Sequence, residues 1–199
     1  MHVVAPDETG LKEAAAAIQR GEIVAYPTET VYGLGVDPFQ DAAIERLYAA
    51  KARSAKSPVL LIVGDFSQLD DVVGPISDQA RKYMEIFWPG PLTLILPASP
   101  KLSRLLNAGA GRIGVRMPAC EIARSLCIAA GRAITSTSAN ISGQPAALSV
   151  AGLDVPNVSV AVDGGILDHS ATSTVFDPDS GVVYREGVIA AAHLVAALP

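Results

Sequence analysis

Residues 26–35, YPTETVYGLG, carry four hydroxyl groups and one carboxylate between an apolar segment and two glycines. The hydroxyls belong to alternate residues, namely Tyr26, Thr28, Thr30 and Tyr32. Residues 22–27, EIVAYP, overlap the start of this stretch and predict a buried strand that Pro27 ends, because proline lacks the amide hydrogen that a sheet requires. A surface turn does not need this much directional hydrogen bonding. The stretch therefore indicates a strand end with a role beyond a turn.

Outward from this stretch, apolar strands alternate with amphipathic helices along the chain. We expect helices at 8–20, about 40–52, 77–87, 101–109, 119–130 and from about 188. We expect strands at 22–27, 59–63, 91–97, 113–117, 133–138, 158–162, 173–177 and 182–186. This alternation, with strands crowded near the end, predicts an α/β fold with a twisted mixed sheet flanked by helices.

The composition predicts one domain over residues 1–199, since 50% of the residues are hydrophobic and can fill one core. No apolar run reaches the roughly 18 residues of a membrane span, and the first residues lack a signal-peptide pattern. We therefore expect a cytoplasmic protein without a membrane partner.

The net charge of −5 argues against broad, sequence-independent binding of nucleic acid. Local basic clusters nevertheless occur. Lys51, Arg53 and Lys56 fall within six residues at the C-terminal end of the second expected helix, and Arg112 and Arg116 lie four residues apart.

Two familiar types of nucleotide site are not supported. Residues 109–114, GAGRIG, fit the glycine pattern of a dinucleotide site, but that pattern must open a helix and here a strand follows it. The chain also lacks a Walker A sequence. Any ATP site must therefore be of another design.

Nucleophilic and metal sites find equally little support. The histidines, His2, His169 and His193, are scattered and match no hydrolase triad. Cys120 and Cys127 stand seven residues apart in an expected helix, too far for an undistorted disulfide. We interpret both cysteines as core thiols and expect no metal site built by protein ligands.

Hydroxyl-rich segments recur at the ends of two later strands. Residues 135–143 contain Ser136, Thr137, Ser138 and Asn140, and residues 171–177 contain Ser173 and Thr174. Each segment alone could be a capped turn. Because open α/β sheets hold ligands at strand ends, three such segments favour one shared site. Arginines and lysines at strand and helix ends would complement phosphates or carboxylates there.

Seven motifs then appear in a family's order: YPTETVYGLG at 26–35, Lys51-Ala-Arg53, WPGPLTLIL at 88–96, VRMP at 115–118, TSAN at 137–140, STV at 173–175, and Arg185-Glu-Gly187. With these motifs the chain resembles the YrdC-like family, the threonylcarbamoyl-AMP synthases, in its short single-domain form. The resemblance implies a nucleotidyltransferase that forms threonylcarbamoyl-AMP and pyrophosphate from L-threonine, bicarbonate and ATP with Mg²⁺. The product would pass to a tRNA threonylcarbamoyl transferase machinery, and contact with tRNA is possible.

The resemblance also implies roles for individual residues. The threonine site would consist of Thr30, Arg116, Ser136 and Ser173. The ATP site would consist of Arg53, Ser57, Arg112, Ser138, Ala146 and Arg185. The catalytic quartet would be Lys51, Arg53, Ser138 and Asn140. Residues 28–32 would form a wall facing the substrate, with the glycines behind them permitting close approach.

Two positions depart from the family pattern. Ile62 stands where some members have a histidine, and Glu186 stands where many have a proline. Two alternatives stay open at this point: an RNA-binding module of the same fold, and a paralogue that acts on a different acceptor.

Overall fold

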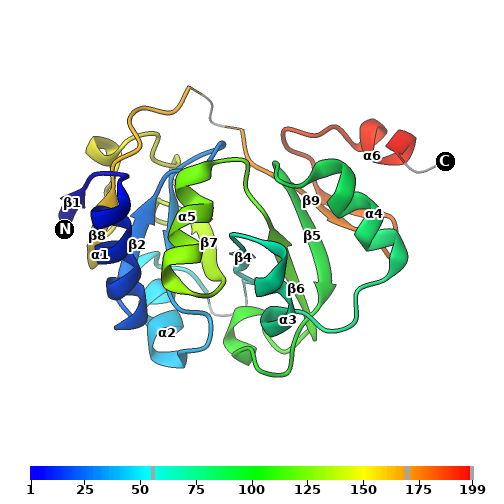
Figure 1. Ribbon diagram of the computed structural model, residues 1–199, viewed down its shortest axis with the longest axis horizontal. Helices are drawn as coiled ribbons and strands as arrows, with labels where there is room; N and C mark the ends of the chain where they lie inside the picture. The colour runs from blue at the N-terminus through cyan, green and yellow to red at the C-terminus, as the bar shows by residue number, and fades with distance from the viewer. Residues whose placement is uncertain (55–56, 169–170, 198–199) are drawn as a thin grey trace.

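The strand expected before Pro27 is β2 (Ile23–Tyr26), and it lies inside a wide sheet. It pairs in parallel with β8 (Val158–Val162) and antiparallel with β3 (Gly33–Gly35). Figure 1 shows the computed structural model, which describes residues 1–54, 57–168 and 171–197. Lys56 and His169 lie outside the described residues.

Ten described strands form the sheet, in the order β1-β8-β2-β3-β7-β4-β6-β5-β9-β10. Those not yet given are β1 (His2–Val4), β4 (Leu60–Ile62), β5 (Leu92–Pro97), β6 (Arg112–Arg116), β7 (Ile134–Ser138), β9 (Thr174–Asp177) and β10 (Val182–Arg185). The sheet contains both parallel pairs, such as β4 with β6, and antiparallel pairs, such as β4 with β7. The expected α/β fold with a mixed sheet is confirmed.

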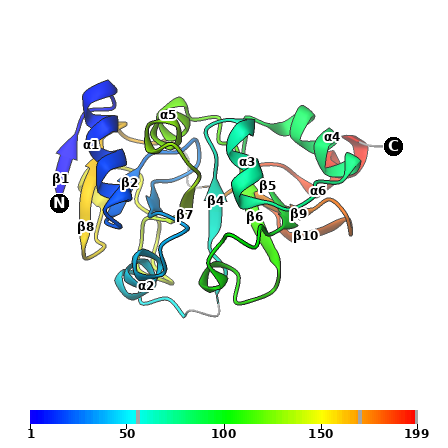
Figure 2. The same cartoon turned by 60° about the horizontal axis from the view of Figure 1, so that its bottom comes forward.

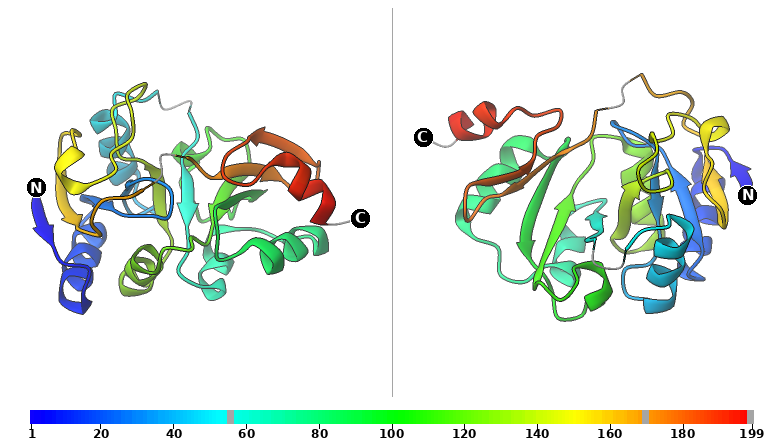
Figure 3. Two further views of the ribbon diagram at one scale, coloured as in Figure 1. Left: turned by 90° about the horizontal axis from the view of Figure 1, so that it is seen from above. Right: turned by 180° about the vertical axis from the view of Figure 1, so that it is seen from behind.

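Helices cover both faces of this sheet. They are α1 (Glu8–Gln19), α2 (Asp41–Ala50), α3 (Leu69–Val72), α4 (Asp78–Phe87), α5 (Glu121–Ala130) and α6 (Ala191–Ala197). Alternate β2 side chains separate the faces, since Val24 and Tyr26 pack with α1 and α5, whereas Ile23 and Ala25 share a core with α2. Figures 2 and 3 show α2 across the sheet from α1 and α5. Among the described residues, no helix is both long and apolar enough to cross a membrane.

The structure differs from the expected elements at short segments. The sequence does not predict β1 or β3. β1 has only three residues, and β3 reads Gly-Leu-Gly, in which glycine has low strand propensity. The helix expected at 101–109 is wrong, since only a 3₁₀ turn at Arg104–Leu106 forms. The glycine-rich residues before β6 open a strand and not a helix, as the interpretation of GAGRIG required.

The glycines of β3 make room for the Tyr26 ring, and Gly33 also lines the pocket described below. Tyr26 is fully buried and donates its hydroxyl hydrogen to the Thr135 carbonyl at 3.0 Å. A Cβ atom at Gly35 would lie 2.9 Å from a Tyr26 ring carbon and 3.2 Å from Ile134. Tyr32 is buried as well, and its hydroxyl donates to Gly165 at 2.8 Å. The interpretation of residues 28–32 as a wall facing the substrate is therefore wrong for Tyr32.

We expect Gly35→Ala to lower the free energy of unfolding by about 1–3 kcal/mol, because the added methyl group overpacks the Tyr26 ring. Urea denaturation would measure the change. Gly152→Ala is the control, since the nearest atom to its added Cβ, Ser149 Oγ, lies at 3.6 Å. The control should stay within about 0.5 kcal/mol of wild type. Equal stabilities for the two variants would contradict the packing argument.

Candidate active site

A pocket of about 200 Å³ lies where the ends of β3, β4, β6, β7 and β9 approach one another. Hydroxyl groups and three arginines dominate its polar lining. Seven residues expected from the sequence line it: Thr30, Arg53, Arg116, Ser136, Ser138, Ser173 and Arg185. Five others do not: Lys51, Ser57, Arg112, Asn140 and Ala146. All four residues expected to bind threonine are thus brought together.

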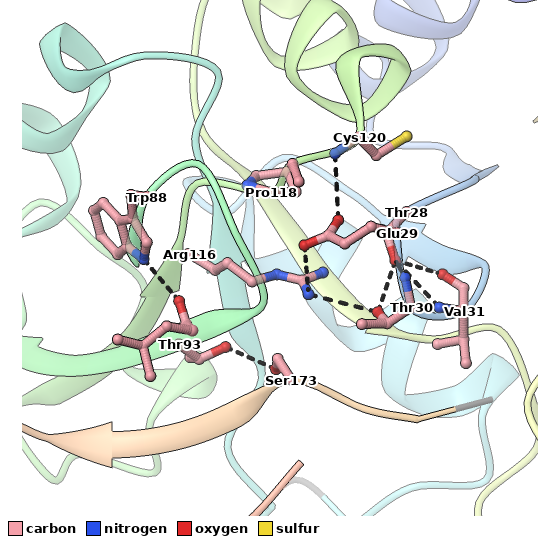
Figure 4. A network of polar contacts seen from close by, with 12 residues as sticks. Thr28, Glu29, Thr30, Val31, Trp88, Thr93, Arg116, Pro118, Cys120 and Ser173 are labelled. Atoms are coloured by element: carbon pink, nitrogen blue, oxygen red, sulfur yellow. Dashed lines mark hydrogen bonds and ion pairs between the residues drawn. The ribbon is translucent and has the colours of Figure 1, made fainter. Parts of the chain in front are cut away.

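Arg116 is held at one wall of the pocket by the loop after β2 (Figure 4). Its Nη1 lies 3.3 Å from Glu29 Oε1 and 3.5 Å from Thr30 Oγ1, and only 6% of its side chain is exposed. Thr28 fixes this loop by donating to the Val31 carbonyl at 2.7 Å while accepting from the amides of Thr30 and Val31. The guanidinium group of Arg116 is therefore held against a loop that is itself fixed by hydrogen bonds.

Ser173 and Arg185 form another part of the pocket wall. Arg185 donates to the Ser173 carbonyl and to the Ser173 hydroxyl, both at 3.1 Å. The same hydroxyl lies 2.9 Å from Oγ1 of Thr93, a residue of β5 (Figure 4). Partial burial lowers the pKa of Arg185, and the nearby guanidinium groups of Arg116 and Arg53 lower it further. The three arginines are thus close enough to repel one another.

Arg53 completes this set of cations. Its Nη1 donates to Thr137 Oγ1 at 3.2 Å, and its Nη2 donates to the Pro58 carbonyl at 2.7 Å. Its Nε is buried and finds no partner among the described residues. Burial lowers the pKa of Arg53, because the charged form loses hydration. A bound anion would relieve this cost.

Lys51 lies behind the pocket wall and contacts the turn that follows β7. Its ammonium donates to the carbonyl of Ser138, to the carbonyl of Asn140 at 2.7 Å and to Asn140 Oδ1 at 3.0 Å. The Ser138 hydroxyl donates to the same Oδ1 at 2.6 Å. Lys51, Ser138 and Asn140 therefore form one network, in which Ser138 alone lines the pocket.

Arg112 lies at the other end of β6 from Arg116. It pairs with Asp177 at 2.7 Å and with Asp179 at 3.4 Å. Ser57 accepts a hydrogen bond from Tyr48 through its carbonyl, and Ala146 is half-buried away from the pocket. The expected ATP contacts of Arg112, Ser57 and Ala146 stay predictions.

The cysteines and Ile62 are apolar neighbours of the site. Both cysteines are free; Cys127 is buried in the core as expected, whereas Cys120 is only half-buried at the start of α5. Ile62 is fully buried and lines the pocket. The position thus contributes an apolar wall here.

Thr28 from the predicted wall and Thr137 from the predicted rim line the pocket, whereas sequence reasoning missed Thr93 and Thr172 and gave Glu29 no role of its own beyond that wall. Thr93 had a usable signal, because it is the one polar residue in the apolar strand β5. Glu29 had none, since pairing with a residue 87 positions away depends on the fold.

The family model named for Sua5, YciO and YrdC, whose description reads "Telomere recombination", matches residues 16–187. The chain belongs to the Sua5/YciO/YrdC family. A threonylcarbamoyl-AMP synthase of Pyrococcus abyssi is 40% identical over 174 residues, which are 86% of this chain and 51% of that protein. One of Vibrio vulnificus is 35% identical over 184 residues, which are 90% of this chain and 99% of that protein.

Solved structures agree with this assignment to the Sua5/YciO/YrdC family. The crystal structure of P. abyssi Sua5 complexed with L-threonine matches with a TM-score of 0.93 at 35% identity, over 99% of this chain and 60% of that one. The chain therefore spans only part of this Sua5 and about half of the P. abyssi synthase. The α/β fold expected from the sequence matches that of this Sua5.

Metal ligands do not converge anywhere in the described parts of the chain, where no three side chains of His, Cys, Asp or Glu form a group that could hold an ion. The pocket itself offers hydroxyl oxygens and guanidinium groups. Such a lining fits an ion that is carried by phosphate oxygens, as Mg²⁺ is with nucleotides.

We expect a pH signature from Lys51. Burial, with Arg53 nearby, lowers the pKa of Lys51 to about 8 from the ordinary 10.5. Between these values the unfolded chain binds more protons than the folded one, so this residue's contribution to stability rises as the pH increases. The stability of wild type relative to Lys51→Met should therefore rise by roughly 1–3 kcal/mol across that window.

Urea denaturation at about pH 7 and about pH 10 would measure this difference. Lys12→Met is the control, because Lys12 is exposed and bonds only to the exposed Glu8. A difference for Lys51→Met that stays constant with pH, like that of the control, would contradict the shifted pKa.

Proposed function

We propose that this chain is an L-threonylcarbamoyladenylate synthase, a nucleotidyltransferase that joins L-threonine, bicarbonate and ATP and releases pyrophosphate. The observation that carries the proposal is the convergence of Arg53, Arg116 and Arg185 on one hydroxyl-lined pocket. The names of the relatives and the L-threonine in the P. abyssi Sua5 complex support the same reaction.

Threonine would occupy the side of the pocket that Arg116 lines. Arg116 would bind the carboxylate through a pair of N–H groups, the geometry that arginine favours. Thr30, Ser136 and Ser173 surround the same space with hydroxyls. A small polar amino acid suits this lining.

ATP would bind toward Arg53, Ser138 and Arg185. The guanidinium groups of Arg53 and Arg185 use only neutral oxygens as partners among the described residues, so their charge is available to phosphates. Mg²⁺ bound with the nucleotide would supply further neutralisation of phosphate charge beside Arg53 and Arg185. Ser57, Arg112 and Ala146 complete the proposed ATP contacts, although they lie outside the pocket lining.

The reaction needs positioning more than a nucleophile from the protein. The threonine amine attacks bicarbonate to give a carbamate and water, and a carbamate oxygen then attacks the α-phosphorus and displaces pyrophosphate. Neither step passes through a covalent enzyme intermediate. Fixed arginines and hydroxyls can align the reactants and stabilise the added negative charge, which are large terms in catalysis. Lys51 and Asn140 would act through Ser138.

The product would be consumed by a tRNA threonylcarbamoyl transferase machinery in the cytoplasm. A module that binds RNA alone is the competing proposal, and the net charge of −5 weighs against it.

The test is pyrophosphate release from ATP and Mg²⁺ with bicarbonate, in the presence of L-threonine, L-serine, L-valine or no amino acid. We expect release that requires both threonine and bicarbonate. Release that depends on another amino acid would keep the reaction and change its substrate. No release, despite measurable ATP binding, would refute the synthase proposal.

We expect Arg53→Ala to weaken ATP use by more than tenfold, because a hydrogen bond to a charged group contributes about 1.5–3 kcal/mol. The KM for ATP and the turnover rate would be measured by pyrophosphate release, with circular dichroism to verify folding. Arg20→Ala is the control, since Arg20 is exposed and pairs only with Glu22. If the Arg53→Ala protein is folded and its ATP use is unchanged, the assignment of Arg53 to the ATP site is wrong.

A further inference from the structure

The three arginines of the pocket differ in how their charge is balanced. Arg116 pairs with the Glu29 carboxylate at 3.3 Å. Among the ion pairs of the described residues, none involves Arg53 or Arg185, which bond to hydroxyl and carbonyl oxygens. The charge of Arg116 is therefore largely balanced, whereas Arg53 and Arg185 carry positive charge that no carboxylate among the described residues balances.

Glu29 is fixed where it pairs with Arg116. Its Oε1 faces Arg116, and its Oε2 accepts the Cys120 amide at 3.4 Å, at the start of α5 (Figure 4). The residues on either side of it, Thr28 and Thr30, line the pocket, whereas Glu29 does not. Its side chain is 19% exposed. Glu29 can therefore affect a ligand in the pocket only through Arg116 and through the electric field of its carboxylate.

Arg116 still has donors to offer a ligand. Glu29 and Thr30 both contact Nη1, and within the described residues Nη2 and Nε form no hydrogen bond. The residue lines the pocket, and these two atoms are not sealed from it as the buried Nε of Arg53 is. Adjacent N–H groups of this kind match the two oxygens of one carboxylate.

We propose that Glu29 is a specificity-determining residue that makes the Arg116 side of the pocket accept an amino-acid zwitterion and reject phosphate. The inference rests on the proposed function, since it assigns the two sides of that same site to its two substrates. An amino acid has no net charge, so its binding beside the Arg116–Glu29 pair leaves no charge unbalanced. Its ammonium group is also attracted by the nearby carboxylate.

Phosphate meets the opposite conditions. It carries more than one negative charge, and Glu29 repels it across a partly buried site where charges are poorly screened. Arg53 and Arg185 offer positive charge without such a neighbour. Without this division, the phosphates of ATP would compete for Arg116 and block the amino acid.

The experiment uses Glu29→Gln, which keeps the shape and an oxygen acceptor but removes the charge. Glu8→Gln is the matched control, because it removes the same charge from an exposed surface pair with Lys12. Calorimetric titration would measure L-threonine binding with and without inorganic phosphate, and phosphate binding alone. Circular dichroism would verify that each variant is folded.

In wild type and in Glu8→Gln, we expect phosphate to leave the Kd for threonine unchanged. In Glu29→Gln, we expect the threonine Kd to rise about tenfold or more, phosphate to raise it further, and phosphate alone to bind at least about threefold more tightly. Phosphate that acts on threonine binding equally in all three proteins would overturn the proposal. A merely structural role for Glu29 would not create competition with phosphate.

The experiment also covers a wild-type protein that binds no threonine and a Glu29→Gln variant that does not fold. If wild type binds no threonine, the proposed function fails, and equal phosphate affinities in wild type and Glu29→Gln would then overturn this inference on its own. If Glu29→Gln does not fold, Glu29→Asp replaces it, since it keeps the charge and shortens the side chain. That variant should bind threonine more weakly while phosphate still does not compete, and competition in it would overturn the proposal.

Discussion

The tight return of the chain from β2 to β3 is the constraint on which the rest of the structure depends. The Tyr26 ring fills the space that Gly33 and Gly35 leave empty, and its hydroxyl bonds to Thr135 on β7. Three strands are thereby fixed at one point of the sheet. The loop between β2 and β3 has to leave this point directly toward the pocket, and it brings Thr28, Glu29 and Thr30 with it.

Buried positive charge is the second theme of the site. Lys51 and Arg116 are almost fully buried, and desolvation of such groups is unfavourable unless polar partners surround them. Lys51 finds backbone and amide oxygens, whereas Arg116 finds a carboxylate. The first arrangement shapes a turn and leaves the ligand to Ser138. The second leaves guanidinium donors for a ligand.

Much of this site could be predicted from sequence, because strand ends and hydroxyl-rich motifs are local features. Thr30, Arg116, Ser136 and Ser173 lie on one pocket, as the motifs indicated. Lys51 could not be assigned to a position behind the wall, because its contacts lie 87 and 89 residues away. Arg112 stands only four residues before Arg116, yet that length of extended chain carries it to the far end of β6 and to Asp177.

The fold was predictable to a similar depth. Long elements with clear periodicity, such as α1, α4 and β5, were found, because burial on one face imposes a pattern on many residues. β1 and β3 each contain only three residues, too few for a pattern, and their pairing depends on partners far along the chain.

Arg185 stands on β10, the last strand at one edge of the sheet, and still reaches the central pocket through Ser173. An edge strand has a neighbour on one side only and is among the first parts of a sheet to open. A ligand held by Arg185 would add a tether on the inner side of this hairpin. Ligand binding in the pocket would thus slow amide hydrogen exchange in β9 and β10, at the edge of the sheet.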